Sequence, residues 1–420
     1  MVTVPRSPLG HILDRHALKP INEALADTRV VLVNGARQCG KSTLVSQIAR
    51  DREAAWFNLD RSDTLAAAKR DPSEFVRAAN PIVIDEIQRA PKLLLAIKEV
   101  VDAGYEPGRF LLTGSSRVLR LRSLPDTLPG RMETIELWPL SQGEIDQIYD
   151  NFVDVVFRDG ASTSCSSDET RQSYITRLVR GGYPEAVARE GRRRTRFLES
   201  YLDDLVDRNF TKAATAEQGT QIRQLITVLA GRNGQLINTA NIAQSVGFPR
   251  TTVERYMALL EEIFLIKRIP AWSNQATVRA VRAPKLAFVD SGIATMLLGQ
   301  DETSLGQITS DIGSVLESFV AMEIARQLSW ASQTITLSHY RTRDQVEVDI
   351  VLQNRRGKVV GIEVKASSTA ADSDFSGLRH LQTRLGDDMI AGLVLYTGQQ
   401  TLPFGNGLRA MPIAALWQRH

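Results

Sequence analysis

A lysine and a serine follow two spaced glycines near the start of the chain, in the sequence GARQCGKST. Gly35 and Gly40 permit tight backbone turns, so successive backbone N–H groups can point at phosphate oxygens. Lys41 would reach the β- and γ-phosphates of a nucleotide, and the Ser42 hydroxyl would bind Mg²⁺. The pattern predicts a phosphate-binding loop made of Gly35, Ala36, Arg37, Gln38, Cys39, Gly40, Lys41, Ser42 and Thr43.

An acidic pair and a cluster of small polar residues each follow a further apolar run. Asp85 and Glu86 end the run IVIDE, which predicts Mg²⁺ binding by Asp85 and orientation of the attacking water by Glu86. In RFLLTGSS, Thr113, Ser115 or Ser116 would contact the γ-phosphate or that water. The alternatives are a solvated acidic pair and a plain turn.

Arg131 follows a glycine in a predicted loop that precedes another strand. An arginine there would stabilise the charge that develops during phosphoryl transfer, on its own nucleotide or on that of a neighbouring chain. A purely structural arginine is the alternative. The predicted catalytic residues of this part of the chain are therefore Lys41, Glu86, Ser115 and Arg131.

Carboxylates and a lysine gather in the sequence EVDIVLQNRRGKVVGIEVK near the C-terminus. Two β-rich runs flank QNRRGK, which predicts a hairpin that brings Asp349 and Glu363 together, with Lys365 beside them. With Glu317 from a predicted amphipathic helix, they would bind Mg²⁺ or Mn²⁺, and Lys365 would orient a water. Charges that alternate along a solvated strand face are the alternative.

The predicted elements place these groups together. Val30–Val33 reads as a buried strand, and apolar residues at helical spacing follow Lys41. A second buried strand at 82–84 ends at the acidic pair. In a doubly wound parallel sheet, such strand ends meet along one edge.

The middle of the chain predicts a linker and then a helix-turn-helix. Residues 151–172 are rich in Ser and Asp and lack a period. Residues 219–272 divide into three helices and a strand, the pattern of a winged helix-turn-helix. Its third helix, which starts at Arg250, would contact DNA or join other domains. The basic run 192–196 would form a solvated helix face, or else contact nucleic acid or the nucleotide.

Bulk composition narrows the class of protein. The 420 residues have a net charge of +3, too small to indicate nucleic-acid binding by itself, and only two cysteines. The cysteines indicate a reducing cytoplasm, and no apolar run predicts a membrane span or a signal peptide.

These motifs, together with LPGRMETIELWPLS, GGYPEAV and LESFVAMEI, resemble a family across almost the whole chain. The sequence is similar to predicted ATPases of bacteria and archaea that join an AAA+-type domain to a C-terminal domain of formerly unknown function. The resemblance implies ATP at Gly35–Thr43, Mg²⁺ at Ser42 and Asp85, and a hydrolytic Glu86. It also implies that the C-terminal domain is similar to PD-(D/E)xK nucleases. The helical lid of ring-forming AAA+ machines is not found.

The predicted fold is multidomain α/β. It comprises a P-loop ATPase domain with a doubly wound parallel sheet and a helical extension (1–205), a winged helix-turn-helix (206–275) and a mixed α/β restriction-endonuclease-like domain (276–420). The predicted function couples ATP binding and hydrolysis to binding or processing of DNA or RNA. The alternative is an ATP-switched regulatory binding protein with an inactive nuclease fold. A homo-oligomer is a candidate assembly.

Overall fold

The chain divides into two compact units in a computed structural model. The structure describes residues 7–115, 128–210, 216–273, 283–307 and 311–418. The first unit comprises Met1–Leu140 with Glu262–Phe264, and the second comprises Ser141–Glu261 with Leu265–His420. None of the helices within the described ranges combines the length and apolar character that a bilayer crossing requires.

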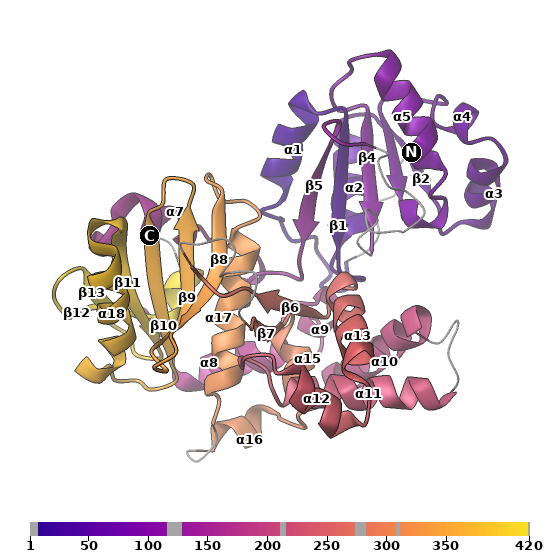
Figure 1. The fold of residues 1–420 in the computed structure, drawn as a ribbon. Helices are drawn as coiled ribbons and strands as arrows, with labels where there is room; N and C mark the ends of the chain where they lie inside the picture. Colours follow the sequence, from indigo (N-terminus) through magenta and orange to yellow (C-terminus); the bar gives the residue numbers. More distant parts are fainter. Residues whose placement is uncertain (1–6, 116–127, 211–215, 274–282, 308–310, 419–420) are drawn as a thin grey trace. The chain divides into compact units, whose positions relative to one another are not determined.

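A five-stranded parallel sheet forms the centre of the first unit (Figure 1), in the order β2-β3-β4-β1-β5. Its strands are β1 Val30–Gly35, β2 Ala55–Asn58, β3 Ile82–Asp85, β4 Phe110–Gly114 and β5 Met132–Leu137. Strands β1, β3 and β4 are buried at every position, which explains their continuous apolar sequences. The predicted strands at 30–33 and 82–84 are confirmed.

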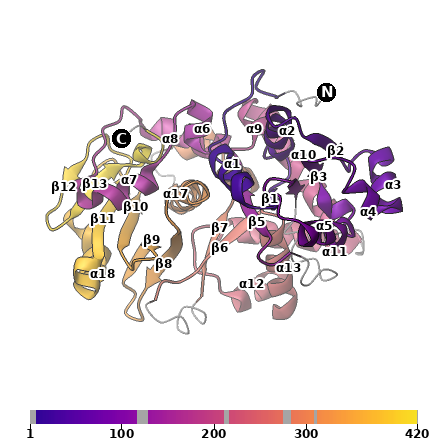
Figure 2. The same cartoon turned by 90° about the horizontal axis from the view of Figure 1, so that it is seen from above.

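Helices cover both faces of this sheet, and Figure 2 shows α2 and α5 on its two sides. The helices are α1 Leu18–Asp27, α2 Lys41–Asp51, α3 Ser62–Arg70, α4 Pro72–Phe75 and α5 Leu93–Ala103, with a 3₁₀ turn η1 Ile87–Arg89. The periodic residues Leu44, Val45 and Ile48 of α2 are buried, as their spacing predicts. Alternate strand residues such as Leu32 and Ile84 share one core with α5.

The second unit begins with a helical part. Its helices are α6 Gln142–Asp146, α7 Phe152–Asp159, α8 Arg171–Arg180, α9 Pro184–Val187, α10 Gly191–Phe210, α11 Ala216–Ala230, α12 Thr239–Val246 and α13 Arg250–Glu262, with a 3₁₀ turn η3 Gly160–Ser162. The Asn238 side chain caps α12, and Gly247 ends it in the left-handed conformation. Two antiparallel strands follow, β6 Ile266–Ile269 and β7 Lys285–Phe288.

A six-stranded mixed sheet, in the order β12-β13-β11-β10-β9-β8, forms the rest of the second unit. Its strands are β8 Ile335–Arg341, β9 Glu347–Asn354, β10 Val359–Lys365, β11 Met389–Tyr396, β12 Leu402–Pro403 and β13 Leu408–Pro412. The accompanying helices are α15 Ser291–Leu297, α16 Glu302–Gly306, α17 Gly313–Gln327 and α18 Ser376–Leu385, with 3₁₀ turns η5 Asp372–Phe375, η6 Gly386–Asp388 and η7 Ile413–Leu416.

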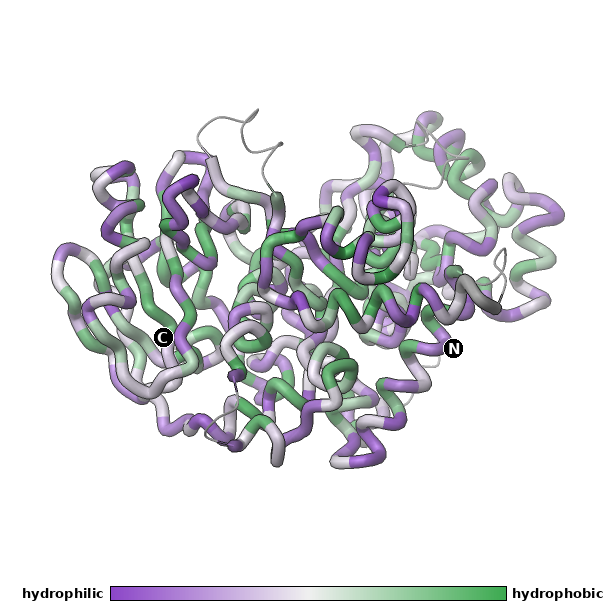
Figure 3. Tube along the Cα trace, turned by 60° about the horizontal axis from the view of Figure 1, so that its bottom comes forward, coloured by the Kyte–Doolittle hydropathy of each residue, from purple (hydrophilic) through white to green (hydrophobic). Residues whose placement is uncertain are grey.

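Helices α17 and α18 lie on opposite sides of this sheet (Figures 1 and 2). Strand β9 forms antiparallel hairpins with β8 and β10, whereas β10, β11 and β13 run parallel. The predicted hairpin around QNRRGK is therefore confirmed. Hydrophobic residues, green in Figure 3, gather in the strands.

Two local predictions are wrong. Residues 151–172 are not only a linker, because Phe152–Asp159 forms α7 and buries Phe152, Val153 and Val156. Helix α17 was expected to be amphipathic, yet nearly its whole circumference is buried. Its charged residues Glu323 and Arg326 bind each other at 2.8 Å inside the unit, so they do not mark a solvent face.

The first unit's main segment ends at Leu140, and the predicted domain bounds at residues 205 and 275 stay a prediction. Long-range hydrogen bonds explain why the segment after Leu140 belongs to the second unit. The Gln142 amide donates to Glu323 at 2.9 Å, and the Val153 amide donates to Gln327 at 3.1 Å. The segment after Leu140 is thus tied to α17.

Candidate nucleotide site and C-terminal carboxylate cluster

The loop between β1 and α2 is shaped by two glycines. A Cβ atom on Gly35 would lie 2.0 Å from the carbonyl oxygen of Leu137 on β5, so no side chain fits there. Gly40 has φ +98° and precedes the first turn of α2. The N-cap residue Gly40 has no side chain that could cap this helix, which leaves its first N–H groups for an anion.

The Lys41 ammonium lies inside this loop. Its Nζ donates to the carbonyl oxygens of Gly35 at 3.0 Å and Ala36 at 2.6 Å, and the residue is 4% exposed. The loop carbonyls therefore hold the positive charge beside the start of α2.

Arg15, which sequence reasoning missed, fixes the same loop from outside. Its guanidinium donates to the carbonyl oxygens of Cys39 at 2.7 Å and Trp138 at 2.8 Å. The arginine thereby joins the loop to the end of β5. It belongs to no local motif, so nothing in the sequence nearby indicates this contact.

Asp85 ends β3 within reach of the loop. Its carboxylate accepts a hydrogen bond from the Thr113 hydroxyl, and the Ser42 hydroxyl lies near enough to affect its pKa. Burial raises the pKa of Asp85, and these hydroxyls counteract the effect in part. The structure thus brings together two predicted Mg²⁺ ligands, Ser42 and Asp85, whereas Thr113 serves as a partner of Asp85.

Glu86 adopts the left-handed conformation, with φ 62° and ψ 47°. The Ser115 hydroxyl at the end of β4 donates to its Oε2 at 3.1 Å, and the Gln88 amide donates to the same oxygen. Gln88 also donates to the Ser115 hydroxyl at 2.8 Å. Gln88 is a second residue that the sequence analysis missed. The candidate residue Ser116 lies outside the described residues.

Arg131 lies at the amino-terminal ends of the parallel strands, whereas the nucleotide loop lies at their carboxyl ends. It precedes Met132, which pairs with Val30 at the start of β1, whereas the loop follows the end of β1. Arg131 forms an ion pair with Asp102 on α5. This placement contradicts a role on the chain's own nucleotide, because the length of the strand separates the two. A role on a neighbouring chain's nucleotide stays a prediction.

In the second unit, Asp349 on β9 and Glu363 on β10 lie side by side. The Asp349 amide donates to Glu363 Oε2 at 3.3 Å, and the Val364 amide donates to Asp349 Oδ2 at 3.0 Å. Lys365 donates to Glu363 at 3.2 Å. The structure thus places three of the predicted residues together.

Lys285, on β7, joins this group although the sequence analysis did not predict it. Its Nζ lies 2.6 Å from Glu317 Oε1 and 2.9 Å from Asp349 Oδ1. The ammonium therefore bridges α17 and β9. We call Lys285, Glu317, Asp349, Glu363 and Lys365 the carboxylate cluster.

Three carboxylates share two ammonium groups in this cluster. Burial, and then the charge of Asp349, raise the pKa of both Glu317 and Glu363. Burial alone would lower the pKa of Lys285, but Asp349 and Glu317 outweigh it and raise that pKa. Within the described part of the chain, no three His, Cys, Asp or Glu residues are arranged to hold a metal ion.

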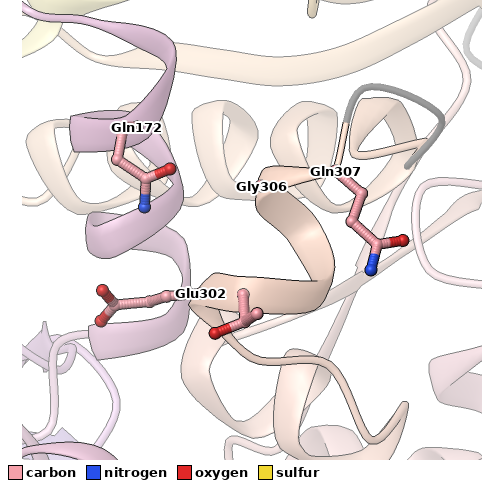
Figure 4. A pocket seen from close by; sticks show the side chains of 5 residues that line it. Gln172, Glu302, Gly306 and Gln307 are labelled. Atoms are coloured by element: carbon pink, nitrogen blue, oxygen red, sulfur yellow. The ribbon is translucent and has the colours of Figure 1, made fainter.

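A cavity of about 480 Å³ opens between α8 and α16 (Figure 4). Gln172, Glu302, Thr303, Gly306 and Gln307 line it. Its polar lining includes no residue predicted from the sequence, and it lies at neither group of residues described above.

The chain resembles known proteins segment by segment. Residues 27–146 match a family model described as an AAA domain, and residues 171–304 and 312–416 match two domains of unknown function. An uncharacterized protein of Mycobacterium tuberculosis is 26% identical over 410 residues, which cover 95% of this chain and 83% of that protein. One of Haemophilus influenzae is 22% identical over 71% of this chain and 74% of its own length.

A Walker-type ATPase of Pyrococcus abyssi is similar in structure with a TM-score of 0.45 and 14% identity, over 71% of this chain and 100% of that one. A likeness at this level supports no conclusion about function. The match to the AAA domain spans the loop, Lys41, Asp85 and Glu86. The N-terminal part of the chain is therefore similar to an AAA domain.

Proposed function

We propose that the first unit binds ATP with Mg²⁺ in the loop between β1 and α2 and hydrolyses it. Lys41 would exchange the carbonyls of Gly35 and Ala36 for phosphate oxygens, which are stronger acceptors because they are charged. The N–H groups at the start of α2 would bind further phosphate oxygens. Ser42 and Asp85 would hold the Mg²⁺, which neutralises charge on the phosphates.

Glu86 would orient and deprotonate the attacking water. The observation that carries the proposal is the Lys41 ammonium inside the loop, at 3.0 Å from the Gly35 carbonyl oxygen and 2.6 Å from that of Ala36, together with the buried Asp85 carboxylate at the end of β3. Calorimetric titration of ATP into the protein, and an assay of phosphate release, each with Mg²⁺ and with EDTA, test the proposal. We expect tight ATP binding and phosphate release only with Mg²⁺. Equal turnover in EDTA would contradict the proposal.

We also propose that residues 206–275 form a winged helix that contacts DNA or RNA. The order α11, α12, α13, β6 supports this, together with the exposed positions of Arg250, Thr251 and Arg255 on α13. Arg250 is paired with Glu254 at 2.8 Å, which reduces the free positive charge of this helix. The charge reversal Arg255→Glu should weaken binding to labelled duplex or single strands, and unchanged binding would contradict the proposal.

A nuclease-like C-terminal domain is the third part of the proposal. Support comes from Asp349 and Glu363 on adjacent strands, Lys365 beside them, and Glu317 on the helix that covers the sheet. In this reading, ATP turnover in the first unit would regulate nucleic-acid processing in the second. An assembly of several chains would place Arg131 at a neighbouring nucleotide.

The second candidate function is a regulatory binding protein that ATP switches and that has an inactive nuclease fold. One observation favours it: the Lys285 ammonium lies between two of the carboxylates that a divalent cation would need. Incubation with Mg²⁺ or Mn²⁺ and plasmid, single-stranded DNA or RNA separates the two candidates. Cleavage that Asp349→Ala and Lys365→Ala abolish supports the first, and no cleavage by any form supports the second.

A further inference from the structure

The backbone around Lys285 is fixed on both edges of β7. On one side, Lys285 pairs with Ile269 of β6. On the other, it bridges to Leu236, and the Ile237 amide donates to the Pro284 carbonyl at 2.8 Å. A strand held on both sides keeps its side chains in place, so the lysine is directed at the carboxylates by the sheet that carries it.

The Lys285 ammonium binds two carboxylates from different elements, at 2.6 Å from Glu317 and 2.9 Å from Asp349. Only 6% of its side chain is exposed. An ammonium carries three N–H donors, and two of them are used here for charged acceptors. A buried lysine needs such partners, because an unpaired charge inside a protein is costly.

A divalent cation would need the space that this ammonium fills. Mg²⁺ binds oxygen at about 2.1 Å, and Mn²⁺ takes the same kind of ligand, so an ion that joined Glu317 to Asp349 would lie between the same two oxygens. The ammonium is already within hydrogen-bond distance of both. The cluster as it stands therefore does not fit a divalent cation.

We propose that Lys285 is the resident cation of the carboxylate cluster and excludes divalent metal ions from it while β7 stays in place. The inference rests on the second candidate function and deepens it, since it names the residue that keeps the nuclease-like site without metal. Strand β7 pairs with β6, which follows α13 along the chain.

Lys365 offers a matched control within the same cluster. Among the residues that the structure describes, it forms an ion pair with Glu363 alone, at 3.2 Å, and 33% of its side chain is exposed. It therefore does not lie between two carboxylates. Loss of its charge leaves the ammonium of Lys285 where it is.

The test measures Mn²⁺ binding to the full chain, free of nucleotide, by calorimetry and by the electron paramagnetic resonance of free Mn²⁺. Lys285→Gln should gain affinity for Mn²⁺ by at least about tenfold, and the double variant Lys285→Gln/Asp349→Asn should lose that gain. The wild type and Lys365→Gln should show no binding that depends on Asp349. Mn²⁺ binding by the wild type that Asp349→Asn removes would overturn the proposal, as would a folded Lys285→Gln chain without any gain.

Labelling of lysines in the wild type with acetic anhydride gives a second readout, should Lys285→Gln not fold. Lys285 should react far more slowly than the exposed Lys69, and saturating Mn²⁺ should not speed its reaction. A rate equal to that of Lys69, or one that Mn²⁺ raises, would overturn the proposal. Neither readout uses ATP turnover or cleavage, so failure of those activities would be distinguishable from failure of this inference.

Discussion

The hydroxyl of Ser115 donates to Glu86 Oε2 at 3.1 Å, which joins the end of β4 to the residue after β3. Gln88 donates to both groups. The orientation of the proposed hydrolytic carboxylate thus depends on two neutral side chains, so they are expected to affect turnover and not nucleotide binding.

Ser115→Ala should lower the rate of ATP hydrolysis about tenfold, the effect of one lost hydrogen bond of about 1.4 kcal/mol. Glu86→Gln should lower it by about 10² to 10⁴, because an amide cannot accept the proton. Both variants should bind ATP as the wild type does. Phosphate release and calorimetry measure the two effects, and unchanged turnover in Glu86→Gln would remove this residue from the mechanism.

Lys41→Ala should weaken ATP binding by at least about 100-fold, since the lost contacts are hydrogen bonds between charged groups. The exposed Lys69 on α3 supplies a matched control, and Lys69→Ala should bind normally. Titration of a fluorescent ATP analogue measures both. Normal binding by a folded Lys41→Ala chain would contradict the assignment of the loop.

Arg15→Ala should both destabilise the first unit and weaken ATP binding, because the carbonyls of Cys39 and Trp138 lose a charged donor. A loss of about 2 kcal/mol in the free energy of unfolding is expected from the two bonds. Arg15→Lys should recover part of it, since an ammonium cannot span both carbonyls as a guanidinium does. Thermal melts with and without ATP measure the change; equal shifts on ATP addition in all three forms would limit Arg15 to a structural role.

The stability of the second unit should depend on pH through Glu323. Burial, which outweighs the pairing with Arg326, raises the pKa of Glu323 from 4.5 to about 7. Between these values the folded chain keeps a proton that the unfolded chain releases. The contribution of Glu323 to the free energy of unfolding is therefore complete below about pH 4.5. It falls by up to about 3 kcal/mol as the pH rises to about 7.

Urea unfolding of the wild type and of Glu323→Gln across this range of pH gives the difference between their free energies of unfolding, which isolates the contribution of Glu323. This difference should change with pH between about 4.5 and 7 and should not change further above about pH 7. A difference that does not depend on pH would show that Glu323 is ionised in the folded chain throughout.

The sequence could predict the nucleotide loop because its residues are neighbours along the chain. Gly35 to Thr43 form one local pattern between a strand and a helix, and Asp85 and Glu86 end a recognisable buried strand. Arg15, Gln88 and Lys285 act through contacts that depend on the fold. Lys285 starts an ordinary apolar run, KLAFV, and only its burial distinguishes it.

The burial of α17 could not be predicted for a related physical reason. Glu323 and Arg326 interrupt its apolar residues, but they pair with each other inside the unit, so nearly the whole circumference of the helix is buried. For Arg131, the motif could not indicate whether the arginine would lie at the amino-terminal or the carboxyl ends of the parallel strands. That depended on the parallel register of β5 with β1.

The inward polar side chains of α17 set a limit on how the protein can be shortened. Gln327 accepts from the Val153 amide and donates to the Leu416 carbonyl at 2.6 Å, while Glu323 accepts from the Gln142 amide. A recombinant fragment that began at residue 276 would keep the helix and lose two of these donors, leaving buried acceptors bare. Truncations meant to isolate the nuclease-like part should therefore start ahead of Gln142.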